Sequence, residues 1–189
     1  QGRYGADVMS RVSFALSDNG GRKLADLIRA QVGGLIAGLV SAARVDPSLI
    51  REVAVVGNTV MHHLFCGIDV TPLSQYPFEP VDDGMHGYTG RDLGWGIVSQ
   101  ASVKFLPCLG GFVGSDVLAG ILATGIHESD SLVGLVDLGT NGEVVIGRAE
   151  RLLCCSTAAG PLSERARYCP DPESAGWMWF RSTGHRAAR

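Results

Sequence analysis

The sequence has few charged residues and no Cys-x-x-Cys motif. Charged residues make up 19% of the 189 residues, the formal net charge is −3, and the basic residues are scattered. Such a chain lacks the dense positive patch that nucleic-acid binding requires. Its five cysteines show no Cys-x-x-Cys spacing, and no charged leader with an apolar signal core is visible. These absences argue against a nucleic-acid partner, a disulfide framework and a zinc or iron–sulfur motif, and they favour a reducing cytoplasm.

Long apolar runs are also missing. No uninterrupted run reaches the roughly 18–20 residues that a membrane-spanning helix needs, and three glycines interrupt the most apolar helical stretch, 32–43. We therefore expect no membrane partner. With 46% hydrophobic residues, the chain can still bury the core of one sizeable domain or two small ones. The expected partners are small molecules or another protein.

Hydrophobic spacing predicts helices that alternate with short strands. The predicted helices cover 5–17, 22–44, 59–66 and 114–126, and the predicted strands cover 53–56 and 102–107. On the helix over 22–44 we expect one broad apolar face formed by Leu24, Leu27, Ile28, Val32, Leu35, Ile36 and Leu39. Residues 68–100 are rich in Pro, Gly, Asp and Tyr and predict a long surface insertion. Three further strands after residue 131 complete an α/β layer followed by the start of a second sheet.

The stretch "LVDLGTNGEVVIG", residues 135–147, has two interpretations. Asp137 ends an apolar run and is followed by Gly139, Thr140, Asn141 and Gly142. A phosphate-binding loop needs converging backbone N–H groups and a nearby carboxylate that holds Mg²⁺ through water, and this stretch offers both. An Asn-Gly dipeptide between apolar runs equally predicts a plain β-hairpin that needs no ligand. The two interpretations are compatible, because a phosphate-binding hairpin is still a hairpin.

Polar residues at predicted helix starts are the other candidates. Asp116 follows Ser115 at the start of the helix over 114–126, where it could cap the helix or orient a water molecule or a metal ion. Asn58 and Thr59 stand at the carboxyl end of a strand, where α/β proteins collect ligands, or they cap the next helix.

Two adjacent histidines begin that next helix. His62 and His63 point in different directions on a helix, so they cannot form an i, i+4 metal-binding pair with each other. We expect both to be packed or to face solvent.

Five stretches together resemble a known family. They are "RYGADVMSRVSFA", "VAVVGNTVMHHLFCGID", "FLPCLGGFVGSDVLAGILATG", "LVDLGTNGEVVIG" and "CSTAAGP". In this order they are similar to the C-terminal domain of the ATP-dependent reductive activators of corrinoid proteins, over about residues 3–161. That domain belongs to the acetate and sugar kinase/Hsp70/actin (ASKHA) superfamily.

The resemblance implies an incomplete ribonuclease-H-like ASKHA fold of class α/β. Residues 1–130, with the insertion 68–100, would form most of lobe one. Residues 131–161 would open lobe two with a phosphate loop. The family pattern Ala-Phe-Glu-Gly does not follow Pro161, where Leu162-Ser163-Glu164-Arg165 stands instead. We therefore expect 162–189 to be an irregular tail, produced by a reading-frame error, and the chain to be a fragment.

The resemblance also implies a function. Family members use ATP hydrolysis to return Co(II) corrinoid proteins to Co(I) for methyl transfer. ATP and Mg²⁺ would be the cofactors, and Asp116 would have a catalytic role. Asn58, Thr59 and the loop from Asp137 to Gly142 would bind the cofactor, with Asp137 holding Mg²⁺ through water.

The same resemblance places the remaining components. A [2Fe-2S] or other iron–sulfur cluster would lie in the full-length parent and not in this chain. The partner would be a corrinoid protein in the cytoplasm, and a homodimer is conceivable. Alone, the fragment is expected to be inactive. A non-catalytic protein-interaction module of the same fold and a small-molecule kinase of the superfamily remain open as alternatives.

Overall fold

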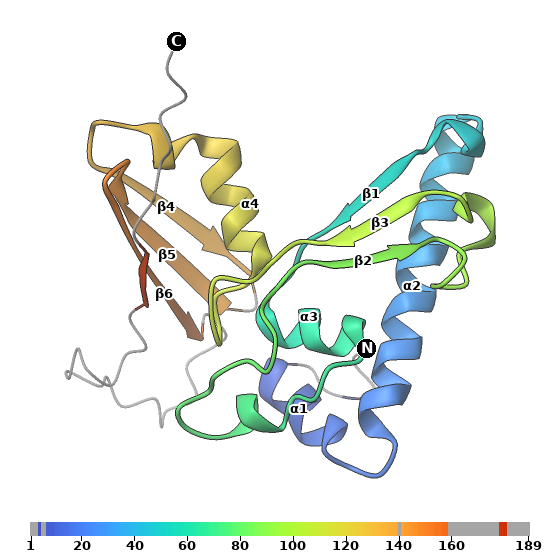
Figure 1. The fold of residues 1–189 in the computed structure, drawn as a ribbon, viewed down its shortest axis with the longest axis horizontal. Helices are drawn as coiled ribbons and strands as arrows, with labels where there is room; N and C mark the ends of the chain where they lie inside the picture. Colours follow the sequence, from blue (N-terminus) through green and yellow to red (C-terminus); the bar gives the residue numbers. More distant parts are fainter. Residues whose placement is uncertain (1–3, 5–6, 140, 159–177, 181–189) are drawn as a thin grey trace. The chain divides into compact units, whose positions relative to one another are not determined.

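The computed structural model describes residues 4, 7–139, 141–158 and 178–180, drawn in colour in Figure 1. The chain divides into two compact units, residues 1–115 and 116–189. Each unit contains helix and one β-sheet, so the protein belongs to the mixed α/β class.

Three helices of the first unit form where the sequence predicts them. They are α1 (Val8–Ala15), α2 (Gly20–Ala43) and α3 (Thr59–Cys66). A capping box starts α1, in which the backbone N–H of Ser10 donates to Asp7 Oδ1 over 2.8 Å. The backbone N–H of Met61 donates to Asn58 Oδ1 over 2.9 Å and starts α3. Gly67 ends α3 in the left-handed conformation, with φ of 75°.

The apolar face of α2 is only partly buried. Leu24 is buried, and the core contacts continue along the helix through the half-buried Ile28, Val32 and Ile36. Leu35 and Leu39, expected on the same face, are 68% and 69% exposed. By helical periodicity Leu35 and Leu39 share a side of α2 with Ile28 and Val32, so the expected broad apolar face exists, but the described core contacts only part of it.

The length of α2 also corrects the expectation about membranes. Its 24 residues are long and apolar enough to cross a bilayer by length and composition, and 17% of the relevant window is buried. The helix continues through the glycines at 33, 34 and 38, as the predicted helix over 22–44 requires. A core helix of a soluble protein passes the same test, so this property alone does not assign α2 to a membrane.

The sheet of the first unit has three strands in the order β1-β3-β2. The two predicted strands, β1 (Glu52–Val55) and β3 (Ser102–Phe105), run parallel and are joined through α3. An unpredicted edge strand, β2 (His86–Thr89), pairs antiparallel to β3. Side chains of the three strands pack with α2 and with Phe65 of α3 in one hydrophobic cluster. The two helices therefore cover one face of the sheet (Figure 1).

Residues 68–100 are part of the core and not a surface insertion. Besides β2 they contain the 3₁₀ helices η3 (Thr71–Ser74) and η4 (Gly96–Val98), and an earlier 3₁₀ helix, η2 (Pro47–Leu49), precedes β1. Their buried side chains are Val70, Leu73, Leu93, Trp95 and Val98. Single large apolar residues between Pro and Gly residues anchor the segment without periodicity, which is why the pattern suggested a loop.

The second unit is an antiparallel sheet in the order β4-β5-β6-β7. Its strands are β4 (Val133–Leu138), β5 (Asn141–Arg148), β6 (Arg151–Ala158) and β7 (Met178–Phe180). The first three were predicted, whereas β7 lies in the tail where no strand was expected. The pairing of β7 with β6 involves residues 152–154.

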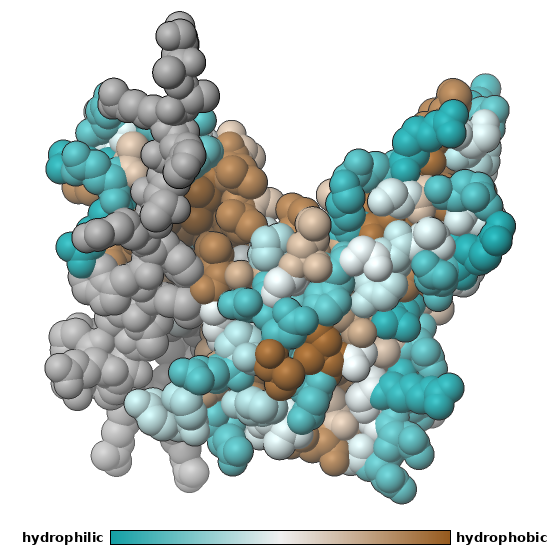
Figure 2. All heavy atoms as spheres, in the orientation of Figure 1, coloured by the Kyte–Doolittle hydropathy of each residue, from teal (hydrophilic) through white to brown (hydrophobic). Residues whose placement is uncertain are grey.

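A helix and a 3₁₀ helix precede this sheet. α4 (Ser115–Thr124) begins at the last residue of the first unit and is followed by η5 (Ile126–Glu128). A Cβ on Gly120 would lie 3.1 Å from Leu135 Cδ2, so the absence of a side chain lets α4 approach β4 closely. Figure 2 shows hydrophobic residues gathered over α4, where Leu122 is 53% exposed.

Candidate functional site

The β4–β5 hairpin carries most of the site predicted from the sequence. Leu138 and Gly142 are the last paired residues, so the chain reverses through residues 139–141. The N–H of Gly139 donates to the carbonyl of Asn141 over 2.8 Å. The Asn-Gly dipeptide thus stands at the beginning of β5 and does not form the centre of the turn. Thr140, one of the predicted cofactor-binding residues, lies outside the described residues.

Few backbone N–H groups of this hairpin are available to a phosphate. The N–H of Gly139 is already hydrogen-bonded within the turn. Asn141 and Gly142 belong to a strand that has β4 on one side and β6 on the other. A phosphate cradle needs several free N–H groups that converge on the anion. The side chains around the hairpin are therefore more informative than its backbone.

Three carboxylates, which we call the acidic trio, come together in the second unit. They are Asp116 at the start of α4, Asp137 on β4 and Glu143 on β5. Asp137 and Glu143 stand directly opposite each other in the strand register. Side chains at such positions have Cβ atoms roughly 4.5–5.5 Å apart, and like charges there repel each other. Glu143 is 7% exposed, whereas Asp137 is exposed.

The electrostatics of the trio show this repulsion. Burial raises the pKa of Asp116, and the charge of Asp137 raises it further. Burial also raises the pKa of Glu143, with added repulsion from Asp116 and Asp137. Ser156 partly offsets this effect, since its Oγ donates to Glu143 Oε1 over 2.9 Å. The ionised forms of Asp116 and Glu143 are disfavoured, and a cation at the trio would stabilise them.

The chemistry of the donor set fits a hard divalent cation. Mg²⁺ is coordinated by oxygen, commonly by one or two carboxylates together with water and phosphate oxygens. Asp116 has one carboxylate oxygen occupied by the backbone N–H of Val117 over 2.9 Å, and this bond fixes the orientation of the carboxylate. Burial raises the pKa of the Asp116 carboxylate, so it holds a proton more tightly than an exposed aspartate does.

Glu143 was missed by the sequence analysis although it lies inside the quoted motif. The signal was the register of the hairpin: with Leu138 and Gly142 as the last paired residues, Asp137 and Glu143 face each other one step further from the turn. A turn centred on the Asn-Gly dipeptide, as the sequence suggested, would lie later along the chain and would not set Asp137 opposite Glu143.

Asn58 and Thr59, in the first unit, have structural roles. Asn58 caps α3 through its side chain, as one interpretation of the sequence predicted. Thr59 is completely buried, and its hydroxyl donates to the carbonyl of Gly110. Ser115, at the end of the same unit, is also buried and exchanges hydrogen bonds with the backbone of Gly57. These contacts account for Asn58, Thr59 and Ser115 without any nucleotide.

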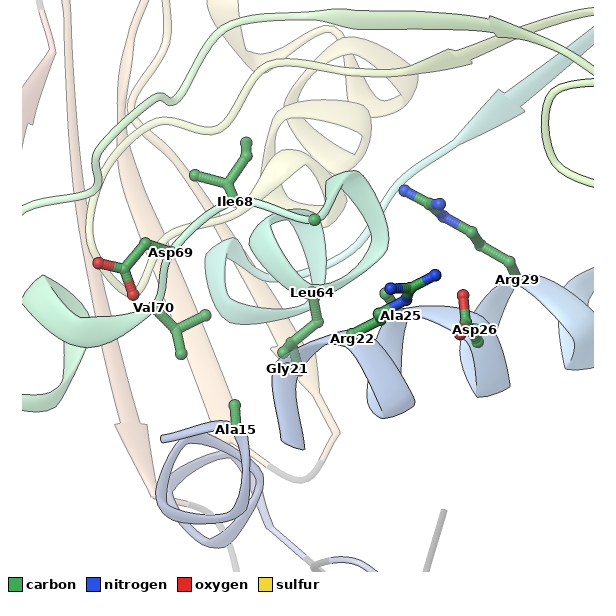
Figure 3. Close-up of a pocket in the computed structure, with 11 residues that line it drawn as sticks. Ala15, Gly21, Arg22, Ala25, Asp26, Arg29, Leu64, Ile68, Asp69 and Val70 are labelled. Carbon is green, nitrogen blue, oxygen red and sulfur yellow. The ribbon is translucent and has the colours of Figure 1, made fainter. Parts of the chain in front are cut away.

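A pocket of about 510 Å³ lies elsewhere in the first unit. Figure 3 shows Arg22, Asp26 and Arg29 following one another along α2, with Asp69 coming from the segment after α3. The Nε of Arg29 donates to the carbonyl of Phe65 over 2.7 Å, which holds this guanidinium in place. Two cations and two carboxylates offset each other in charge. None of the residues predicted to bind a cofactor lines this pocket.

Comparisons with known proteins agree with the resemblance. Residues 1–129 match the family model of the RACo middle region, and residues 131–168 match the model of the C-terminal domain of RACo, the ASKHA domain. The corrinoid activation enzyme RamQ of Eubacterium limosum is 32% identical over 164 residues, which cover 86% of this chain and 27% of RamQ.

A solved structure is similar as well. It is described as a reductive activator for corrinoid, iron–sulfur protein and has a TM-score of 0.79 and 31% sequence identity. The match covers 85% of this chain and 26% of the solved chain, so the sequence spans about a quarter of the length of these relatives. The chain belongs to the RACo family, since its residues 1–129 match the middle region and its residues 131–168 match the C-terminal ASKHA domain.

Proposed function

We propose that this chain is part of an ATP-dependent reductive activator of corrinoid proteins and that the acidic trio holds the Mg²⁺ of bound Mg·ATP. The observation that carries the proposal is the convergence of three carboxylates: Asp137 and Glu143, on a hairpin within the region that matches the ASKHA domain, and Asp116, which lies in the region that matches the RACo middle region. The names of the two relatives support corrinoid activation as the purpose of the whole protein.

In this proposal each residue has a defined task. Asp137, which is exposed, and Asp116 provide oxygen ligands to the ion directly or through water. Glu143 is held by Ser156 and orients one of these waters or accepts its proton. Binding of phosphate oxygens by Gly139, Thr140, Asn141 and Gly142 stays a prediction, since the N–H of Gly139 is hydrogen-bonded within the turn and Asn141 and Gly142 belong to β5.

The wider reaction follows from the family. Hydrolysis of ATP would supply the free energy for a one-electron reduction of Co(II) corrinoid to Co(I), with the electron delivered by an iron–sulfur domain of the longer protein. We also propose that residues 131–161 open a ribonuclease-H-like lobe. The assignment of residues 1–130 to lobe one, and of catalytic and cofactor roles to Asp116, Asn58 and Thr59, stays a prediction.

Binding of a fluorescent ATP analogue to the 189-residue chain, with Mg²⁺ or with EDTA, tests the proposal. We expect Mg²⁺-dependent binding that Asp137→Asn weakens at least about ten-fold, equivalent to ~1.4 kcal/mol. Asp130→Asn, which removes the same charge from an exposed position in the same unit, is the matched control and should bind like the wild type. Equal affinity in Asp137→Asn and Asp130→Asn, or binding that is indifferent to EDTA, would exclude the metal-holding role.

A second measurement separates the alternatives. A full-length relative with the same trio, supplied with ATP, a reductant and a Co(II) corrinoid protein, should generate the Co(I) absorption spectrum. The Asp137→Asn counterpart should lose this activity. A phosphorylated small molecule as the product would indicate a kinase, and full activation without ATP turnover would indicate an interaction module.

A further inference from the structure

Two imidazoles and a thiol meet in the first unit, whereas the acidic trio belongs to the second. His62 and Cys66 lie on α3, and His86 is the first residue of β2. Each of them offers one ligand atom, and these three atoms lie within 4.8 Å of one another. His62 and Cys66 are one helical turn apart, so they share a face of α3. His62 is completely buried, and the other two side chains are half-buried.

The hydrogen bonds of the histidines fix their neutral tautomers. His62 Nε2 lies 3.0 Å from the carbonyl of Gly84, and a carbonyl only accepts, so the proton is on Nε2 and Nδ1 keeps its lone pair. His86 Nε2 lies 3.1 Å from Asp82 Oδ2, which in the same way leaves a lone pair on Nδ1 of His86. Each imidazole therefore carries one unprotonated nitrogen; that of His62 lies 3.5 Å from Nδ1 of His63, a contact that a metal ion would replace.

This pattern of partners is typical of imidazoles that bind metals. Such histidines commonly donate their second ring N–H to a backbone carbonyl or a carboxylate, which fixes the ring and raises its basicity. Gly84 and Asp82 play these two roles, and the backbone N–H of Gly84 in turn donates to Asp82 Oδ1 over 2.8 Å. Burial lowers the pKa of His62, which keeps this imidazole neutral at physiological pH.

We propose that His62, Cys66 and His86 form a binding site for a zinc-class divalent ion. Two imidazole nitrogens and one thiolate are a donor set that Zn²⁺ accepts in a tetrahedral arrangement, with a fourth position left for water. Zn–N and Zn–S bonds of roughly 2.0–2.3 Å place ligand atoms roughly 3.3–3.8 Å apart. The ligand atoms, which lie up to 4.8 Å apart, must therefore approach one another by at most about 1.5 Å.

Binding has a balanced chemistry and a structural consequence. A Zn–S bond forms as the Cys66 S–H bond breaks, and the proton passes to solvent, with no change in oxidation state. The ion links α3 with β2, the edge strand that residues 68–100 contribute to the sheet. The bound ion would hold residues 68–100 against α3 and so stabilise their packing.

Zinc affinity, measured with the 189-residue chain against a chromophoric chelator, tests the site. Free Co²⁺ provides a second readout, because a thiolate ligand gives a charge-transfer band in the near ultraviolet. The variants are Cys66→Ser and His86→Asn. Their matched controls in the second unit are Cys155→Ser, a half-buried free thiol, and His127→Asn, a half-buried imidazole. Circular dichroism verifies that each variant is folded.

We expect one zinc ion per chain, with a Co²⁺–thiolate band that is lost in Cys66→Ser and retained in Cys155→Ser. His86→Asn should weaken zinc binding, and His127→Asn should not. Asp82→Asn, which removes only the carboxylate that orients His86, should weaken it by roughly 10–100-fold. Wild-type affinity in a folded Cys66→Ser variant, loss of binding in Cys155→Ser, or no binding by the folded wild type would each overturn the proposal.

Discussion

Replacing Asp137 by Asn should stabilise the metal-free protein near neutral pH. Removing a charged surface side chain usually has little effect or destabilises. Here Asp137 faces Glu143 across the hairpin, and its charge also raises the pKa of Asp116. The amide is nearly the same size as the carboxylate and removes this repulsion without leaving a cavity.

The magnitude follows from the geometry. Like charges directly opposite each other on neighbouring strands destabilise by roughly 0.2–1 kcal/mol, and the exposure of Asp137 favours the lower half of this range because solvent screens its charge. In a chain of this size a gain of 1 kcal/mol raises Tm by roughly 2–4 °C. We therefore expect an increase in Tm of at most about 2.5 °C at low ionic strength, which added salt reduces.

The pH dependence has a definite sign. The pKa values of Asp116 and Glu143 are raised in the folded state above the ordinary values of 3.8 and 4.5. The folded state therefore holds these protons more tightly, and the resulting stability is fully present below the ordinary pKa values and is lost as pH rises through the raised ones. Because Asp137 contributes to both shifts, Asp137→Asn should lose less stability over this window than the wild type.

Thermal unfolding between pH 4 and pH 8, in low salt and with EDTA, measures this effect. The Tm difference between Asp137→Asn and the wild type should be small at pH 4 and should grow as pH rises. Asp130→Asn should follow the wild type throughout. If Asp137→Asn unfolds at a lower temperature than the wild type at pH 7, or if its difference from the wild type does not depend on pH, the inferred repulsion is not present.

Two further predictions concern packing in the first unit. Gly33→Ala should destabilise the protein by roughly 1–3 kcal/mol, because its Cβ would lie 2.5 Å from Trp95 Cδ1. Gly34→Ala, whose Cβ would meet no atom within 4 Å, should instead stabilise the protein by roughly 0.5–1 kcal/mol. Urea unfolding of both variants checks the opposite signs. Thr59→Val should lower the free energy of unfolding by roughly 1–3 kcal/mol, because it leaves the carbonyl of Gly110 unpaired in the interior. Thr59→Ser, which keeps the hydroxyl, should retain most of the stability. Equal losses of stability in both variants would indicate that packing and not the hydrogen bond matters.

Local patterns were sufficient to predict most helices and strands. The bounds of α3 agree with the prediction at both ends because Asn58 caps its beginning and Gly67 ends it, and both signals are visible in the sequence. β1, α3 and β3 were each predicted as separate elements, and the structure adds the parallel pairing of β1 with β3. The elements themselves depend on neighbouring residues, which the sequence displays directly.

Features that depend on distant residues were missed. β2 was not predicted because "HGYT" has a weak strand pattern, and its stability comes from pairing with β3. Glu143 joins the acidic trio only through the register of the hairpin. The cluster of His62, Cys66 and His86 depends on β2 as well, since His86 is 20 residues from Cys66 along the chain. On α3 the i, i+4 partner of His62 is Cys66, which a comparison of the adjacent His62 and His63 does not reveal.

The contribution of residues 68–100 to the core has a consequence for how this region varies in evolution. A surface loop accepts insertions, deletions and polar substitutions freely, and its sequence diverges quickly. This segment instead carries anchors such as Leu73 and Trp95, separated by exposed stretches. Among relatives we expect the lengths between the anchors to differ while the anchors themselves stay large and apolar. An alignment built on the spacing of these anchors should therefore identify distant members of the family that overall identity would miss.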